Sequence, residues 1–162
     1  MRPWLVLAGG AAVYAAATAW GAARWPEDAV PLHFDASGAV DRVGSRTEAV
    51  TSLTVLGAVM LVLGAGLVLL ALRGPLTAFN FPNRSHWLTA ERLPRLRRML
   101  ATDVAVVIGA TLVFLALLPL WTTLAVESGA APSPLLFWGP TAGFLLAVLA
   151  WGVRSARRYR AG

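Results

Sequence analysis

Four long apolar runs constrain the fold of this chain more than any other feature of its sequence. Each run is long enough for a transmembrane helix, because about 20 residues at ~1.5 Å rise cross a ~30 Å hydrocarbon core. With 57% hydrophobic and 14% charged residues, the chain is too apolar for an ordinary soluble domain. The sequence therefore predicts an all-α membrane protein, a four-transmembrane-helix bundle forming a single membrane domain over residues 1–162. The expected spans cover about 3–24, 50–72, 101–123 and 135–153.

Positive charge is distributed unevenly along the chain, whose formal net charge is +6. Arginines crowd the segment 73–100 and the tail 154–160, whereas the loop 25–49 is acidic and the loop 124–134 holds only Glu127. The positive-inside rule then predicts that both termini and the basic segment 73–100 are cytoplasmic, with the other two loops outside. Arginines beside the spans suit anionic lipid, so we expect the lipid bilayer as a partner and no nucleic acid.

The first run also fits a secretory signal, but its apolar stretch is longer than a typical signal core, so we expect a retained span. The chain has no cysteine, which excludes disulfides, thiolate metal sites and cysteine nucleophiles. It contains no phosphate-binding loop, HExxH or GxSxG motif. The sequence therefore offers no recognised catalytic motif.

The loop 25–49 concentrates the polar chemistry of the chain, with five of its eight acidic residues. Around His33, apolar and polar residues alternate with a period of two, which is typical of a strand. The following Asp-Ala-Ser-Gly, which ends at Gly38, is favourable turn chemistry. We therefore predict an extracytoplasmic β-hairpin of strands 30–34 and 39–43 between the first two spans.

Capping patterns predict where two helices begin. Ser45 and Glu48 have the spacing of a capping box, so the second helix should start at Arg46. Thr89 is expected to cap a helix that carries Pro94 in its first turn.

Other residues in the runs predict local features. Asp103 lies close to the inner end of the third span, so we expect it to be paired or to reach the interface. Pro119 should kink the outer end of that span. A flat packing face is predicted for the small residues Ala11, Ala15, Ala19 and Ala23, which lie four apart.

The polar loop resembles a module of the SdpI-like bacterial membrane family, a family of largely unknown function whose named example confers immunity against a sporulation-delaying toxin. Shared order and spacing cover the first third of the chain. The matching residues are His33, Phe34, Asp35, Gly38 and Asp41, with Arg46 where the family has lysine. A second matching stretch contains Asn80, Pro82, Asn83, Trp87 and Glu91, with His86 in place of an aromatic residue.

The resemblance implies a multi-pass protein of the bacterial cytoplasmic (inner) membrane, and it supplies no catalytic residue. We expect Phe81 and Trp87 of the second stretch to lie in the headgroup layer. An aromatic collar under the loop could include Trp25, Phe34, Trp121 and Trp138.

His33, Asp35 and Asp41 are the candidate metal ligands, because imidazole and carboxylates suit a divalent metal such as zinc or manganese. No other cofactor is implied. In the alternative, structural interpretation, Asp35 caps the turn, Asp41 pairs with Arg42 or Arg46, and His33 bonds backbone.

Two functional classes follow from these residues. The first is a binding, immunity or signalling protein whose outer loop contacts a peptide or another membrane subunit. The second is a small membrane enzyme or carrier that uses His33 and the acidic residues. A polar cavity reaching from the loop into the bundle would favour the second class, and a flat loop with internally paired polar groups would favour the first.

Overall fold

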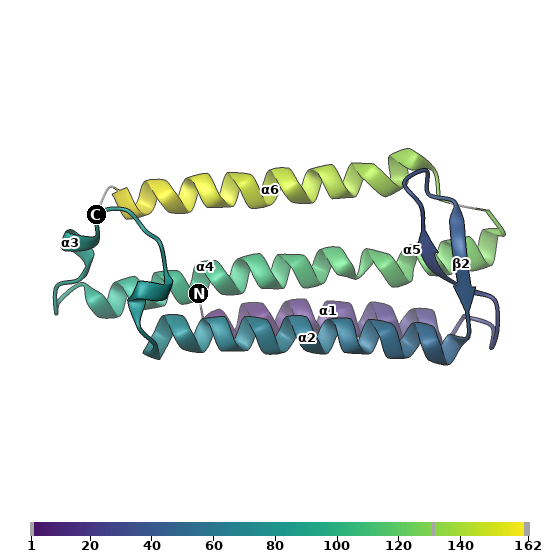
Figure 1. Cartoon of the computed structure of the whole chain (residues 1–162), viewed down its shortest axis with the longest axis horizontal. Helices are drawn as coiled ribbons and strands as arrows, with labels where there is room; N and C mark the ends of the chain where they lie inside the picture. Colours follow the sequence, from purple (N-terminus) through teal and green to yellow (C-terminus); the bar gives the residue numbers. More distant parts are fainter. Residues whose placement is uncertain (1, 131, 161–162) are drawn as a thin grey trace.

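Long helices and one two-stranded hairpin make up the computed structural model, which describes residues 2–130 and 132–160 (Figure 1). Residues 1, 161 and 162 of the membrane domain predicted over 1–162 lie outside the described residues. Four helical stretches are long and apolar enough to cross a membrane, as the sequence predicts. The elements are α1 (Pro3–Ala22), β1 (Val30–Phe34), β2 (Val40–Gly44), α2 (Arg46–Arg73), the 3-10 turn η1 (Leu76–Ala78), α3 (Arg84–Trp87), α4 (Leu93–Leu115), α5 (Leu117–Ser128) and α6 (Pro134–Arg160).

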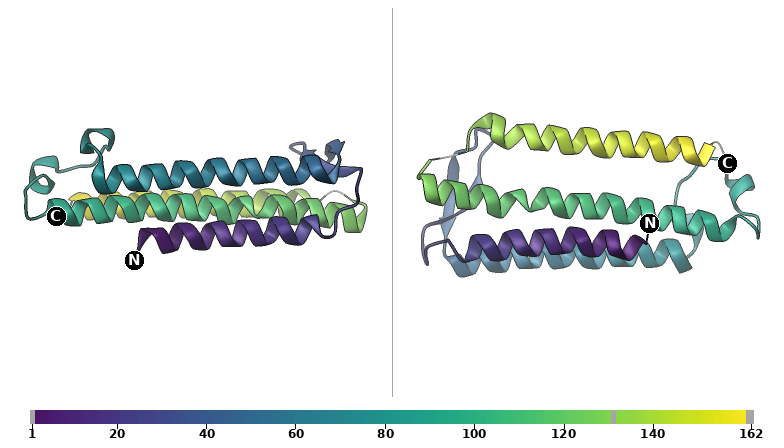
Figure 2. Two further views of the ribbon diagram at one scale, coloured as in Figure 1. Left: turned by 90° about the horizontal axis from the view of Figure 1, so that it is seen from below. Right: turned by 180° about the vertical axis from the view of Figure 1, so that it is seen from behind.

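Helix α4 lies at the centre of the bundle and contacts α1, α2 and α6 (Figures 1 and 2). Helices α1 and α2 run side by side on one side of α4, and α6 runs alone along the other. The hairpin covers one end of the bundle, and α3 lies at the opposite end. None of the apolar window of α6 is buried, so this helix presents most of its surface outward.

Helices α1 and α4 approach closely where two glycines meet. A Cβ added at Gly10 would lie 2.6 Å from the Gly109 carbonyl oxygen, so a side chain there would force the helices apart. The buried face of α1 contains Gly10, Tyr14 and Thr18, whereas Ala15 and Ala19 are exposed. The predicted alanine packing face is therefore wrong within this chain, because the close approach runs through glycine instead.

The third apolar stretch is divided at Ala116 into α4 and α5. Pro119 follows three residues later, and its ring clashes with the carbonyl of Leu115 in a continuous helix. The interruption fits a local effect of Pro119, and the kink itself stays a prediction.

Strands β1 and β2 pair antiparallel, with Val30 opposite Gly44 and Phe34 opposite Val40. The register is irregular on either side of His33, and β2 begins one residue later than predicted. Gly38 has φ of +87°, a left-handed conformation that favours glycine. The predicted turn at Gly38 is confirmed.

Helix α2 begins at Arg46, and the Ser45 hydroxyl accepts a hydrogen bond from the Glu48 backbone N–H at 3.1 Å. This cap was predicted, but the Glu48 side chain bonds Arg42 instead of closing the capping box. The cap predicted at Thr89 is wrong. Helix α4 begins at Leu93, four residues later, after a turn in which the Thr89 carbonyl accepts from two backbone N–H groups.

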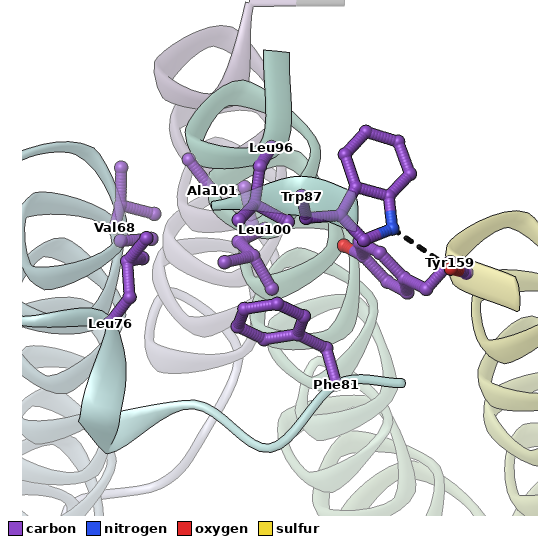
Figure 3. Packing of buried hydrophobic residues seen from close by; sticks show 10 residues of the cluster. Val68, Leu76, Phe81, Trp87, Leu96, Leu100, Ala101 and Tyr159 are labelled. Atoms are coloured by element: carbon purple, nitrogen blue, oxygen red, sulfur yellow. Dashed lines mark hydrogen bonds between the residues drawn. The ribbon is translucent and has the colours of Figure 1, made fainter. Parts of the chain in front are cut away.

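The end of the bundle near α3 contains an aromatic core (Figure 3). Phe81 and Trp87 are 4% and 2% exposed, so they are buried by protein instead of lying at a surface. The Trp87 indole N–H donates to the Tyr159 carbonyl at 2.8 Å and thereby joins α3 to α6. They pack against α4 and α6, and their place in a headgroup layer stays a prediction.

Candidate functional site

The hairpin brings His33 and Asp41 together across its two strands. His33 Nδ1 lies 2.7 Å from Asp41 Oδ1, and both side chains are exposed, at 66% and 47%. An ionised Asp41 accepts the Nδ1 proton, which in the neutral ring leaves Nε2 as an acceptor. No described residue hydrogen-bonds Nε2. The pair therefore presents an oriented imidazole with one available nitrogen.

Asp35 has a different role, because it organises the turn. Its Oδ1 accepts from the Ser37 hydroxyl at 2.6 Å, the Ser37 N–H at 2.8 Å and the Ala39 N–H at 3.0 Å. The Ser37 hydroxyl, with these backbone donors, holds the pKa of Asp35 below its usual value. This is the capping role predicted by the structural interpretation.

The neighbouring arginines do not pair with Asp41, which corrects one part of the structural interpretation. Arg42 instead pairs with Glu48 at the start of α2. Arg46 donates to the Trp25 carbonyl at 3.2 Å and lies 3.7 Å from the Glu27 carboxylate. Arg42 therefore joins the hairpin to α2, and Arg46 joins the start of the first loop to α2.

A cavity of about 410 Å³ lies beneath the hairpin. His33, Arg42 and Glu48 contribute polar groups to its wall, and most of the remaining lining is apolar or aromatic. The lining residues come from the loop after α1 (Trp25) and from β1, β2, α2, α5 and α6, so the cavity exists only in the folded bundle. It can hold an apolar group of moderate size beneath an oriented histidine and an ion pair.

Aromatic residues build the floor and edge of this cavity. Trp25 is 2% exposed and its indole N–H donates to the Thr123 hydroxyl at 3.0 Å. Phe137 of α6 stacks near Trp121, with ring centroids 4.6 Å apart, and also lies 6.4 Å from Phe34. The predicted collar residues therefore take part in the packing at this end.

Trp138, the fourth residue of the predicted collar, acts at the tip of the hairpin. Its indole N–H donates to the Ala36 carbonyl at 2.9 Å, so α6 holds the turn in place.

The predicted metal ligands are only partly brought together. Within residues 2–130 and 132–160, no group of three or more His, Asp or Glu side chains is placed to hold a metal ion. His33 and Asp41 adjoin, whereas the Asp35 carboxylate is occupied by the turn. In this arrangement His33 could contribute one metal ligand, with Asp41 orienting it from behind.

The second stretch that matches the family lies at the opposite end of the bundle, and its residues occupy three different environments. Asn80 and Pro82 line another cavity of about 410 Å³. Trp87 is in the aromatic core, and Asn83 adopts the left-handed conformation at the start of α3. Glu91 is exposed and makes no ion pair with any described residue, so the structure does not bring it to the others.

Asp103 also lines the cavity that Asn80 and Pro82 line. Its carboxylate accepts from Arg158 at 2.5 Å and from the Tyr159 hydroxyl at 2.7 Å. Asp103 is therefore paired, as predicted, and its partners come from α6.

Comparison with protein-family models, curated proteins and solved structures found no match to this chain. The resemblance to the SdpI-like module therefore rests on the motif residues themselves.

Sequence reasoning missed the cavity beneath the hairpin and the Arg42–Glu48 pair that borders it. The six-residue separation of Arg42 and Glu48 crosses from a strand into a helix, so no helical or strand periodicity relates them. The cavity has no sequence signal at all, because it forms where the hairpin and α2 meet α5 and α6, which are far from them in the chain.

Proposed function

We propose that this protein crosses the bacterial cytoplasmic membrane four times, with its hairpin outside and both termini inside. Its four apolar helices support this placement. The charge distribution supports the orientation, because arginines gather at the α3 end while the acidic residues Asp35, Asp41 and Glu48 lie at the hairpin end.

Reporter fusions test this orientation. Fusions at residues 38 and 129 should report an external location, and a fusion at residue 85 should report an internal one. An internal signal at residue 38 would overturn the orientation and every inference about an external hairpin.

We further propose that the protein is a binding protein of immunity or signalling type, in the manner of the SdpI-like family. Its ligand is an apolar segment of a peptide or of another membrane subunit. The observation that supports this is the cavity beneath the hairpin, whose floor is largely apolar. The polar groups above it, His33, Arg42 and Glu48, are already paired within the hairpin end, which suits recognition better than nucleophilic chemistry.

Filling the cavity tests the binding proposal. Synthetic apolar peptides carrying an environment-sensitive fluorophore would be titrated into the purified protein in detergent. A saturable fluorescence change is expected for wild type and should be lost in Leu118→Trp, whose larger side chain occupies the cavity.

The matched control is Leu145→Trp, because Leu145 is an exposed residue of α6, 60% accessible, and does not line this cavity. Equal responses from the two variants, or no saturable response from wild type to any peptide, would contradict the proposal. Melting curves of both variants separate lost binding from lost folding.

A second candidate function is a small membrane enzyme or carrier that holds a divalent metal at His33. The observation that favours it is the His33–Asp41 pair, since metal-binding histidines commonly donate their other N–H to a carboxylate. Zinc or manganese binding should then disappear in His33→Ala and weaken by about 10–100-fold in Asp41→Asn.

Both variants should fold, because an exposed ion pair contributes only about 0–1 kcal/mol. A wild-type protein that takes up neither metal, measured by elemental analysis after equilibration and desalting, would refute this candidate and leave the peptide-binding proposal standing.

A further inference from the structure

An open groove of about 1000 Å³ runs along the exposed side of α6, far from the hairpin. Its lining changes character along the helix. The part nearer the middle of α6 is apolar, and the part nearer its C-terminal end carries three arginines. The lining residues are Leu146, Leu149, Ala150, Val153, Arg154, Arg157 and Arg158. The groove is therefore amphiphilic, with an apolar section and a cationic section in line.

The arginines of this groove carry uncompensated charge. Arg154 and Arg157 are exposed and make no ion pair with any residue that the structure describes. Arg154 lies three positions from Arg157 and four from Arg158, and both spacings place side chains next to each other on a helix. Like charges at this spacing repel, so an anion shared among them would relieve the repulsion.

Arg158 is held by two hydrogen bonds and keeps one buried donor unsatisfied within the described chain. One of its terminal nitrogens donates to Asp103 at 2.5 Å and to the Ser155 hydroxyl at 2.9 Å, which holds the guanidinium in place. Its Nε–H is buried and has no hydrogen-bond partner among the described residues. An unsatisfied buried donor of this kind is unfavourable. The guanidinium is thus held in a fixed orientation at the edge of the groove that Arg154 and Arg157 also line.

We propose that this groove binds one anionic phospholipid. The phosphate accepts from Arg154, Arg157 and Arg158, and an acyl chain lies along Leu146, Leu149 and Val153. Arginine suits this ligand, because a guanidinium presents several donors in a plane to phosphate oxygens. The proposal rests on the membrane placement proposed above, which brings the groove into contact with lipid.

The apolar section decides between a phospholipid and inorganic phosphate. Leu146 and Leu149 are 65% and 64% exposed, and no part of the described chain covers them. Inorganic phosphate would use the arginines and leave these residues uncovered, whereas a phospholipid uses both sections. A zwitterionic phospholipid would cover the leucines but would bring no net negative charge to the arginines.

Lipid titration of the intact protein in neutral detergent tests the proposal. Short-chain phosphatidylglycerol would be added, and the bound lipid counted by native mass spectrometry. Arg154→Gln with Arg157→Gln should weaken phosphatidylglycerol binding by about thirtyfold, from roughly a fivefold loss for each arginine near a lipid headgroup. The control, Arg73→Gln with Arg98→Gln, removes the same charge from two exposed arginines outside the groove and should change binding less than about threefold.

Three results would overturn the proposal. The control variant could lose as much affinity as the groove variant, which would show a diffuse charge effect. Phosphatidylcholine could bind as tightly as phosphatidylglycerol, or inorganic phosphate could displace the lipid at equal concentration. Reporter fusions test the membrane placement independently, so a failed lipid site with an external residue 38 would refute the groove alone.

Discussion

The buried hydrogen bond between Trp25 and Thr123 should be the principal link between the first loop and α5. Thr123 is fully buried, and Trp25 is 2% exposed. The indole N–H of Trp25 donates to the Thr123 hydroxyl at 3.0 Å. In Thr123→Val a methyl group replaces this hydroxyl, so the indole N–H has no acceptor. Leaving a buried donor unsatisfied costs about 1–3 kcal/mol, so the free energy of unfolding should fall by that amount.

The measurement is thermal unfolding in detergent, followed by circular dichroism. For a chain of this size the expected loss corresponds to a fall in Tm of about 2–4 °C per kcal/mol. Trp25→Phe removes the donor itself, so adding Thr123→Val in that background should cost about 1 kcal/mol less than it does in wild type. A Thr123→Val protein that melts with wild type, or equal costs of Thr123→Val in both backgrounds, would refute the assigned hydrogen bond.

Three further outcomes are expected at the hairpin end. Gly38→Val should lower the Tm and speed proteolysis of the hairpin, because valine tolerates φ of +87° poorly and its Cβ would lie 2.8 Å from the Pro132 carbonyl oxygen; unchanged proteolysis would contradict the turn. Ser45→Ala should cost about 1 kcal/mol by removing the acceptor of the Glu48 N–H, measured by thermal unfolding, and a neutral effect would show that the cap is dispensable. Asp35 has a lower pKa in the folded protein than in the unfolded chain. Its contribution to stability is therefore complete above the unfolded pKa and is lost as the pH falls through the folded pKa. The free energy of unfolding should consequently fall less on acidification in Asp35→Asn than in wild type.

The elements that were predictable depend on neighbours in sequence. The apolar runs, the turn at Gly38, the start of α2 after Ser45 and the break near Pro119 are each encoded within a few residues. Local chemistry decides such features, because a left-handed turn, a missing N–H or a capping hydroxyl acts over one helical turn or less. The same reasoning failed at Thr89, where a suitable cap residue precedes a helix that begins at Leu93.

The partners of the polar side chains were not predictable in the same way. Sequence reasoning left two interpretations of Asp41 open, a metal ligand beside His33 and Asp35 or a partner of Arg42 or Arg46. The structure pairs it with His33 alone, across an irregular register. It expected Asp103 to be paired, but not that α6 supplies both of its partners.

The classes of element could be inferred from the sequence alone, namely four helices long and apolar enough to cross a membrane and one polar hairpin between the first two. Hydrophobic length and turn chemistry are properties of contiguous residues, so they can be read without a fold. The central position of α4, the burial of Phe81 and Trp87 and the cavity beneath the hairpin follow from how the helices pack together. These depend on which helix faces meet, and the pattern of side chains on one helix does not specify the partner that covers it.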